Sequence, residues 1–215
     1  MHKTGIVFCC AIIAVCTACT SDAIVRSGVL HSANKVPLSA ERSQLADVAS
    51  RITLALDEAC GCRPASNVES SSPRVCGYPI TIEYRSELYA STNGKRIRIT
   101  SGMLRFFAHD DELAFVLAHE LSHILLGHAG AFSGLSPTSA EAEADQLGIR
   151  IVSDAHFDTK IAAKFPERLA RSYPGMNSRY GAYGMPAQRT ALISSAFGKG
   201  SRQQAYADPR GSCNG

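Results

Sequence analysis

The chain has 215 residues, of which 45% are hydrophobic and 19% are charged, and its formal net charge at pH 7 is +3. This length suits one globular domain, and the apolar content is sufficient for a buried core and excludes wholesale disorder. Because 22 basic residues are nearly balanced by 19 acidic ones, the composition has no positive excess of the kind that holds nucleic acid.

The N-terminal segment has the layout of a secretory signal. A positive start at residues 1–3 precedes a ten-residue apolar run, Ile6–Val15, which is followed by small residues and Cys19. Such a run is too short to cross the roughly 30 Å hydrocarbon core of a bilayer. Small residues before a cysteine resemble the bacterial lipobox, which implies a signal peptide over 1–18 and a lipid-anchored tether over 19–37.

This resemblance also implies a location. In the Gram-negative pattern, an Asp directly after the lipidated cysteine retains the protein at the inner membrane, and Thr20 occupies that position here. We therefore expect an outer-membrane lipoprotein that faces the periplasm and touches the membrane only through its anchor on Cys19. The alternative is a soluble periplasmic or secreted protein.

The cysteine count agrees with export. Loss of the signal peptide and lipidation of Cys19 leave an even number of cysteines, which in an oxidising compartment favours up to two disulfides of open connectivity. A metal site built on these cysteines is the weaker alternative, because the spacing of zinc ribbons is absent. The four remaining cysteines are Cys60, Cys62, Cys76 and Cys213.

The pattern downstream of the tether predicts one α+β domain over residues 38–197 and a flexible tail over 198–215. Its first element is a helix from Ser39 to about Cys60, because apolar residues recur there at intervals of three and four. The following stretch, residues 63–79, is rich in Pro and Ser and predicts an exposed loop.

Two β-prone runs flank Asn93-Gly94, a dipeptide that strongly indicates a short β-hairpin. Another strand is expected just before this hairpin, where polar and apolar residues alternate. The three predicted strands cover residues 80–84, 88–92 and 95–100.

Three further helices are expected after the strands. The first begins with acidic residues, which suit the positive end of a helix, and it is apolar on nearly all sides, so we expect it to be buried. The last contains Pro166, which should break or restart it. The helices are expected at about residues 110–126, 138–153 and 159–173, with an irregular segment at 174–190.

The buried helix carries the sequence His119-Glu120-Leu121-Ser122-His123. Histidines four residues apart lie on one face of a helix and can bind one metal ion, while Glu120 is near enough to act on water at that ion. The alternative is a pair of core histidines with satisfied hydrogen bonds. Burying these groups on an apolar helix without a partner would cost several kcal/mol.

A tetrahedral catalytic zinc needs a third protein ligand, and the next helix offers carboxylates. Glu141 and Asp145 are four residues apart and share a face, whereas Glu143 points away. This face can supply one ligand and one carboxylate that orients a ligating histidine through its other ring nitrogen. The alternative is that Thr138 and Glu141 form a capping box at the helix start.

Another histidine, His128, follows His123 by five residues. On an ideal helix it would lie about 140° from His123 around the axis. We therefore expect His128 to cap the end of the helix and not to bind the same metal ion.

Three segments together resemble the M48 metallopeptidases: Asp111–Ala114, His119–His123 and Glu141–Gly148. The resemblance implies an α+β, zincin-like fold in which a buried active-site helix packs with further helices against a small sheet. It also implies one Zn²⁺ per chain, Glu141 as its third ligand, Asp145 beside a ligating histidine, and endopeptidase activity on polypeptides. The 17 residues between His123 and Glu141 are too few for the membrane hairpin of integral-membrane relatives.

The expected chemistry is hydrolysis of a peptide bond, with Glu120 as general base. Candidates for stabilising the developing oxyanion are Arg189, Tyr180 and Tyr183. The strand at 88–92 is either a docking edge for an extended peptide or an ordinary sheet edge.

The leading hypothesis for function is a zinc endopeptidase that acts on misfolded or unassembled envelope proteins. The alternative is a lipoprotein of the same fold that works mainly as a chaperone or assembly partner with a latent peptidase centre. A third possibility, a soluble protease that cleaves repressors, is disfavoured by the export signal.

Overall fold

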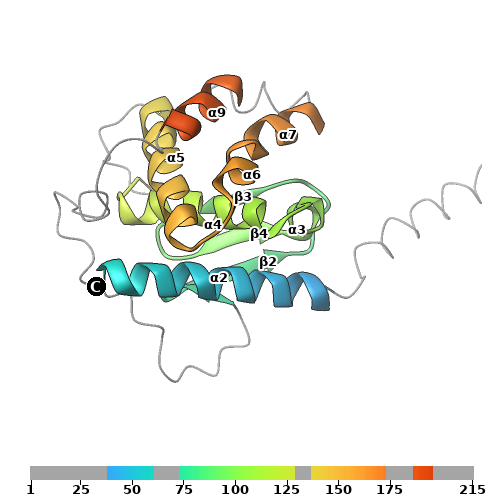
Figure 1. Ribbon diagram of the computed structural model, residues 1–215. Coiled ribbons are helices and arrows are strands. Elements are labelled where there is room, and N and C mark those ends of the chain that lie inside the picture. Colours follow the sequence, from blue (N-terminus) through green and yellow to red (C-terminus); the bar gives the residue numbers. More distant parts are fainter. Residues whose placement is uncertain (1–37, 61–72, 129–136, 173–185, 196–215) are drawn as a thin grey trace, which may run out of the picture. The chain divides into compact units, whose positions relative to one another are not determined.

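The computed structural model describes residues 38–60, 73–128, 137–172 and 186–195 (Figure 1). The predicted signal peptide, tether, lipidation site and C-terminal tail all lie outside these residues, as do Tyr180 and Tyr183. Within the described part, the mixture of helices with one small sheet confirms the predicted α+β class.

The first helix, α2, covers Ser39–Cys60. The apolar residues that predicted it form one buried stripe, because positions three and four apart share a face. Their side chains are at most 1% exposed: Leu45, Val48, Ile52 and Leu56.

Four strands form a mixed sheet in the order β1-β2-β4-β3. Strands β2 and β4 are parallel, and β3 and β4 form the predicted antiparallel hairpin. Asn93 builds the turn, since its Oδ1 accepts hydrogen bonds from the backbone N–H groups of Lys95 and Arg96, both at 3.1 Å. The strands are β1 (Arg74–Val75), β2 (Tyr78–Glu83), β3 (Ala90–Thr92) and β4 (Ile97–Thr100).

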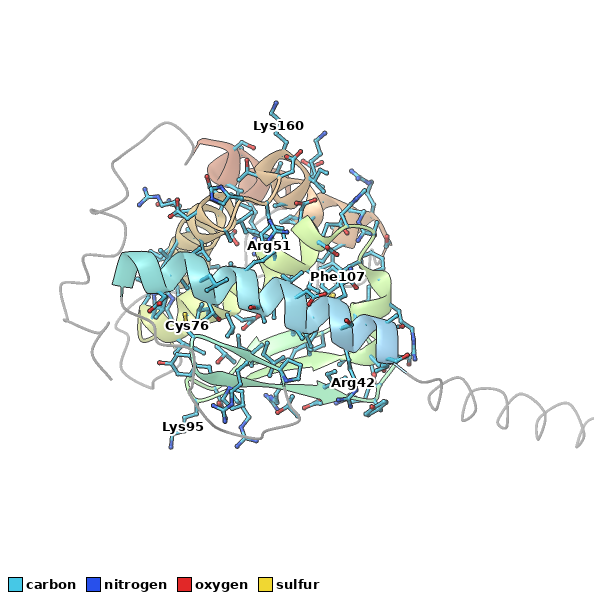
Figure 2. All side chains as sticks on the ribbon, turned by 60° about the horizontal axis from the view of Figure 1, so that its bottom comes forward. Arg42, Arg51, Cys76, Lys95, Phe107 and Lys160 are labelled. Atoms are coloured by element: carbon cyan, nitrogen blue, oxygen red, sulfur yellow. The ribbon has the colours of Figure 1, made fainter. Side chains whose placement is uncertain are left out.

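Strand β1 corrects the prediction of an exposed loop over residues 63–79. Its two residues pair antiparallel with the start of β2, and a strand of that length is too short for any alternation to show in the sequence. Cys76, in the turn between them, donates its backbone N–H to Thr53 Oγ1 on α2 at 3.0 Å (Figure 2). The predicted disulfides are not tested, because Cys62 and Cys213 lie outside the described residues and the side chain of Cys60 is not described.

The remaining helices follow the predicted order with two additions. Thr100 caps α3, a short helix that the sequence analysis did not anticipate, and Pro186 begins α9 within the segment predicted to be irregular. Proline suits the first turn of a helix, which explains this start. The predicted break near Pro166 separates α6 from α7. The bounds are α3 (Ser101–Phe106), α4 (Asp110–Leu125), α5 (Pro137–Asp154), α6 (Thr159–Ala163), α7 (Phe165–Ser172) and α9 (Pro186–Ser195).

Helix α4 is the buried helix that its apolar sequence predicted. Every residue from Glu112 to Ser122 is buried, because α4 contacts α2, the strands β3 and β4, and the helices α5 and α6 (Figure 1). Side chains on opposite faces of this helix are therefore held by different neighbours, and the histidines it carries have little freedom to move.

The start of α4 is anchored by Glu112. Its carboxylate accepts the backbone N–H of Ala108 at 2.8 Å and two hydrogen bonds from Arg168 on α7, both at 2.6 Å. The Arg168 guanidinium also lies 4.0 Å from the centre of the Phe106 ring. A buried carboxylate needs such partners, and here they connect α4 to α7.

Helix α2 is fastened to the end of α5 by Arg51. Its guanidinium lies 3.5 Å from the centre of the Phe157 ring and donates to the backbone oxygens of Ala155 and His156 at 3.0 and 2.9 Å. None of the helices in the described residues combines the length and apolar character needed to cross a membrane.

Candidate metal centre

Two histidines from α4 point to the same place. His119 and His123 are one helical turn apart, and their Nε2 atoms are 3.1 Å from each other. Their side chains are only 11% and 13% exposed. Two ring nitrogens at this distance can share either one proton or one metal ion.

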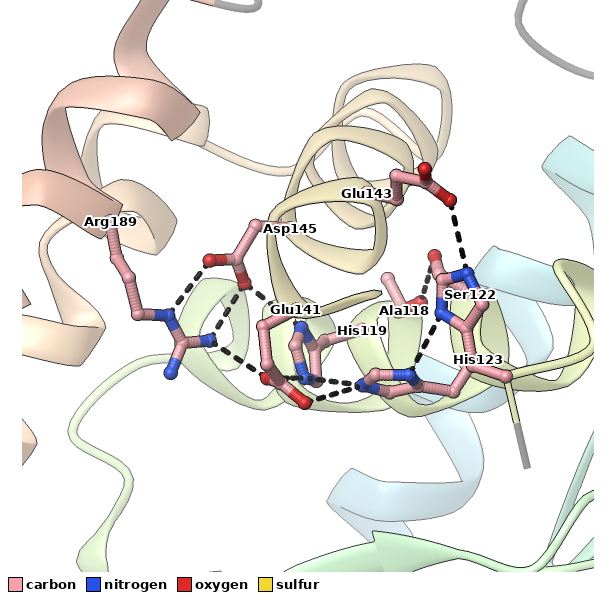
Figure 3. A network of polar contacts seen from close by, with 9 residues as sticks. Ala118, His119, Ser122, His123, Glu141, Glu143, Asp145 and Arg189 are labelled. Carbon is pink, nitrogen blue, oxygen red and sulfur yellow. Dashed lines mark hydrogen bonds and ion pairs between the residues drawn. The ribbon is translucent and has the colours of Figure 1, made fainter. Parts of the chain in front are cut away.

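Glu141 on α5 completes a group of three. Its Oε2 lies 3.2 Å from His119 Nε2, and its Oε1 lies 3.2 Å from His123 Nε2 (Figure 3). A tetrahedral metal ion with ligands at roughly 2.0–2.1 Å would hold its ligand atoms about 3.3 Å apart. The spacing of these three side chains therefore fits a zinc ion, and their chemistry, two imidazoles and one carboxylate, suits zinc as well.

Helix α5 approaches α4 closely because one residue at the crossing has no side chain. A Cβ atom placed on Gly148 would lie 3.1 Å from the backbone nitrogen of His119 and 3.2 Å from its Cα. Both atoms belong to a buried helix that cannot easily yield. Gly148 thus lets the acidic face of α5 come within reach of the histidines.

The electrostatics of the group favour a bound cation. Burial opposes a charge on His119, but its contacts with Asp145 and Glu141 outweigh burial and raise its pKa to about 10. Burial likewise opposes the charge on Glu141, yet contacts with both histidines hold its pKa well below the usual range. Glu141, which favours a proton on Nε2 of His119, would also favour a divalent cation there, and Asp145 adds negative charge on the Nδ1 side.

Asp145 lies behind His119. Its Oδ1 is 2.9 Å from His119 Nδ1, and because that nitrogen makes no hydrogen bond of regular geometry, the contact is mainly electrostatic. The Asp145 side chain is 1% exposed, and although burial opposes its charge, Arg189 and His119 lower its pKa. It is therefore a charged partner for the ring nitrogen that faces away from Glu141.

Arg189 comes from α9 and binds Asp145. Its Nε donates to Oδ2 at 2.8 Å and its Nη2 donates to Oδ1 at 2.7 Å, while Nη2 is also 3.9 Å from Glu141 Oε2 (Figure 3). This paired contact fixes Asp145 against His119. The expectation that Arg189 stabilises an oxyanion stays a prediction, and the sequence analysis missed its pairing with Asp145.

Glu120 lies between the two histidines in α4 and is 8% exposed. Burial raises its pKa, and the nearby charge of Glu141 raises it further, against the lowering effects of His119 and His123. A carboxylate with a raised pKa can take up a proton more readily at neutral pH than an exposed glutamate can.

The two neighbouring acids on α5 differ as their positions predicted. Glu141 is 8% exposed and faces the histidines, whereas Glu143 lies on the outer side and has a side chain that is 47% exposed. Glu141 lies against the two imidazoles (Figure 3), so the capping-box alternative does not account for its position.

His128 does not lie where an ideal helix would place it. Helix α4 ends at Leu125, and Gly127 adopts a left-handed conformation with φ of +69°, which returns the chain towards the helix. The backbone N–H of His128 then donates to the carbonyl of His123 at 2.9 Å, as expected of a helix cap. Its ring, however, contacts the ring of His123 at 3.1 Å between their Nδ1 atoms, which the sequence analysis did not anticipate.

A comparison with known protein families bears on this arrangement. Residues 68–137 match the model of peptidase family M48. This segment is similar to the M48 peptidases. The segment includes both histidines and Glu120, while Glu141, Asp145 and Arg189 follow it in the chain. No curated protein matches the chain. The M48 match supports a metallopeptidase, and the ligand atoms of His119, His123 and Glu141 lie close enough together to hold one metal ion.

Proposed function

We propose that this protein is a zinc-dependent endopeptidase of the bacterial cell envelope that acts on misfolded or unassembled envelope proteins. The observation that carries the proposal is the approach of Glu141, from α5, to within 3.2 Å of both histidines of α4. The M48 segment that contains those histidines supports it.

The residues have distinct roles in this proposal. His119, His123 and Glu141 hold one Zn²⁺, which when bound supplies Lewis acidity and lowers the pKa of water. Glu120 accepts a proton from the attacking water and delivers it to the leaving amine. Asp145, fixed by Arg189, orients the ring of His119.

The position of strand β3 supports the proposal that the substrate is a polypeptide. Among the described strands it pairs only with β4, so one of its backbone edges carries no strand, and it contacts the active-site helix α4. An extended peptide can add to such an edge through main-chain hydrogen bonds. Because main-chain hydrogen bonds are similar for nearly all residues, this mode of binding depends little on the substrate's sequence. Such low selectivity suits a protease for unfolded chains.

Digestion of an unfolded protein tests the proposed activity. The purified full chain should contain about one zinc per molecule and should cleave casein. Removal of the metal with a chelator should stop cleavage, and added Zn²⁺ should restore it. A zinc-loaded protein that suppresses aggregation but leaves casein intact would instead favour the chaperone alternative.

The envelope location is proposed from the N-terminal sequence alone. Cys19→Ala removes the expected lipid attachment point, so the variant should leave the membrane fraction while its zinc content stays the same. Fractionation of cells followed by metal analysis measures both effects, with Cys16→Ala as a matched control within the signal segment. A Cys19→Ala protein that remains membrane-bound after a salt wash would refute the lipid anchor.

A further inference from the structure

Both ring nitrogens of His123 have partners. Nε2 faces Glu141 and His119, and Nδ1 lies 3.1 Å from Nδ1 of His128. The other nitrogen of His128, Nε2, lies 3.1 Å from Glu143 Oε2. The His128 side chain is only 2% exposed and that of Glu143 is 47% exposed, so a continuous line of polar contacts runs from the centre to the surface.

The protons along this line can be assigned. A neutral imidazole has one N–H donor and one acceptor nitrogen, and an ionised carboxylate only accepts. If His123 offers the lone pair of Nε2 to a metal, its proton is on Nδ1 and is donated to Nδ1 of His128. The proton of His128 is then on Nε2 and is donated to Glu143.

The opposite assignment turns two of these contacts into unfavourable ones. A proton on Nδ1 of His128 would put two N–H groups against each other when Nε2 of His123 is the ligand. It would also place the lone pair of His128 Nε2 against the Glu143 carboxylate. A donor facing a donor, or a lone pair facing a carboxylate, is costly in a buried place, so these contacts favour one tautomer for each ring.

We propose that His128 is a positioning residue that holds His123 in its metal-binding tautomer and orientation. This inference rests on the proposed metal centre and adds to it: His119 is oriented by Asp145, and His123 is oriented by His128. Glu143 sets the tautomer of His128, but from an exposed position where water can take over its hydrogen bond. Partners of this kind typically contribute a factor of about 10 to 100 in metal affinity.

Two substitutions of nearly equal size separate positioning from packing. In His128→Asn, the amide Oδ1 occupies about the position of the imidazole Nδ1 and can accept the proton of His123. In His128→Leu, no acceptor is present. We expect His128→Leu to weaken Zn²⁺ binding by about 10- to 100-fold, and His128→Asn to stay close to the wild-type affinity.

Zinc affinity is measured on the full chain by competition with a chromogenic chelator, and unfolding of the metal-free protein is followed for the same variants. Equal zinc affinities for His128→Asn and His128→Leu would overturn the inference, whether both are normal or both are reduced. Failure of the wild-type chain to bind zinc would reject the metal centre itself, and with it the proposed function.

A second test uses the wild-type chain, so its result does not depend on whether the His128 variants fold. NMR of the zinc-loaded protein with ¹⁵N-labelled histidine reports which ring nitrogen carries each proton. We expect His123 to be protonated at Nδ1 and His128 at Nε2. Protonation of His128 at Nδ1 would contradict the proposed role.

Discussion

Glu120→Gln should abolish proteolysis while the protein keeps its fold and its zinc. The substitution removes the group that we propose accepts and returns the proton, but leaves His119, His123 and Glu141 unchanged. General acid–base catalysis typically contributes about 10²- to 10⁴-fold to a rate, so we expect a loss of at least about 100-fold in kcat/KM for casein or an unfolded protein.

The fold should tolerate this change for an electrostatic reason. Burial raises the pKa of Glu120, which means that folding penalises its charged form relative to the unfolded chain. Glutamine has nearly the same shape and no charge, so the thermal unfolding temperature should not fall. Glu167→Gln, on the surface of α7, serves as the control and should leave the rate unchanged. Cleavage by Glu120→Gln at the wild-type rate would show that the proposed mechanism is wrong.

Glu141→Ala should remove zinc and activity together, whereas Glu143→Ala should leave both nearly normal. Glu141 contacts both histidine Nε2 atoms at 3.2 Å, and its loss leaves two imidazoles without the carboxylate that completes the group. Residues that only orient a metal ligand already contribute a factor of about 10 to 100 to metal affinity. For the loss of a ligand itself we therefore expect zinc affinity to fall by more than about 100-fold.

Glu143 is the matched control because it lies on the same helix, two residues away, and bears the same charge. Its exposed carboxylate contacts His128, and because water can replace it, we expect a stability change of about 1 kcal/mol or less and a change in zinc affinity of only a few-fold. Metal analysis, casein digestion and circular dichroism of both variants measure the difference. Zinc loss in Glu143→Ala with zinc retained in Glu141→Ala would reject the assignment of the third ligand.

The local elements and the relative directions of their side chains could be predicted from the sequence. The spacing of four places His119 and His123 on one face of α4, and Glu141 and Asp145 on one face of α5, because helix geometry alone determines these relations. The Asn-Gly turn between β3 and β4 is equally local. The burial of α4 followed from a sequence that is apolar on nearly every side.

Other features depend on contacts between segments that are distant in the chain. No local pattern indicates that Arg189 on α9 pairs with Asp145 on α5, or that the two-residue strand β1 finds its partner in β2. These pairings are decided when the helices pack, since the partner of a buried charge is whatever the fold brings within hydrogen-bond distance.

His128 is the clearest case in which a local sequence pattern and the tertiary structure give different positions for a side chain. Extending the helix beyond Leu125 places its ring on the wrong side of the axis, and this gave the expectation of a simple cap. Gly127 is the signal in the sequence that the helix ends there, because glycine adopts the left-handed conformation without a steric cost. The spacing of residues within α4 and α5 thus determined the candidate ligands. Only the tertiary structure decided which groups contact those residues, because it turns the chain back at Gly127, packs α5 against α4 and packs α9 against α5.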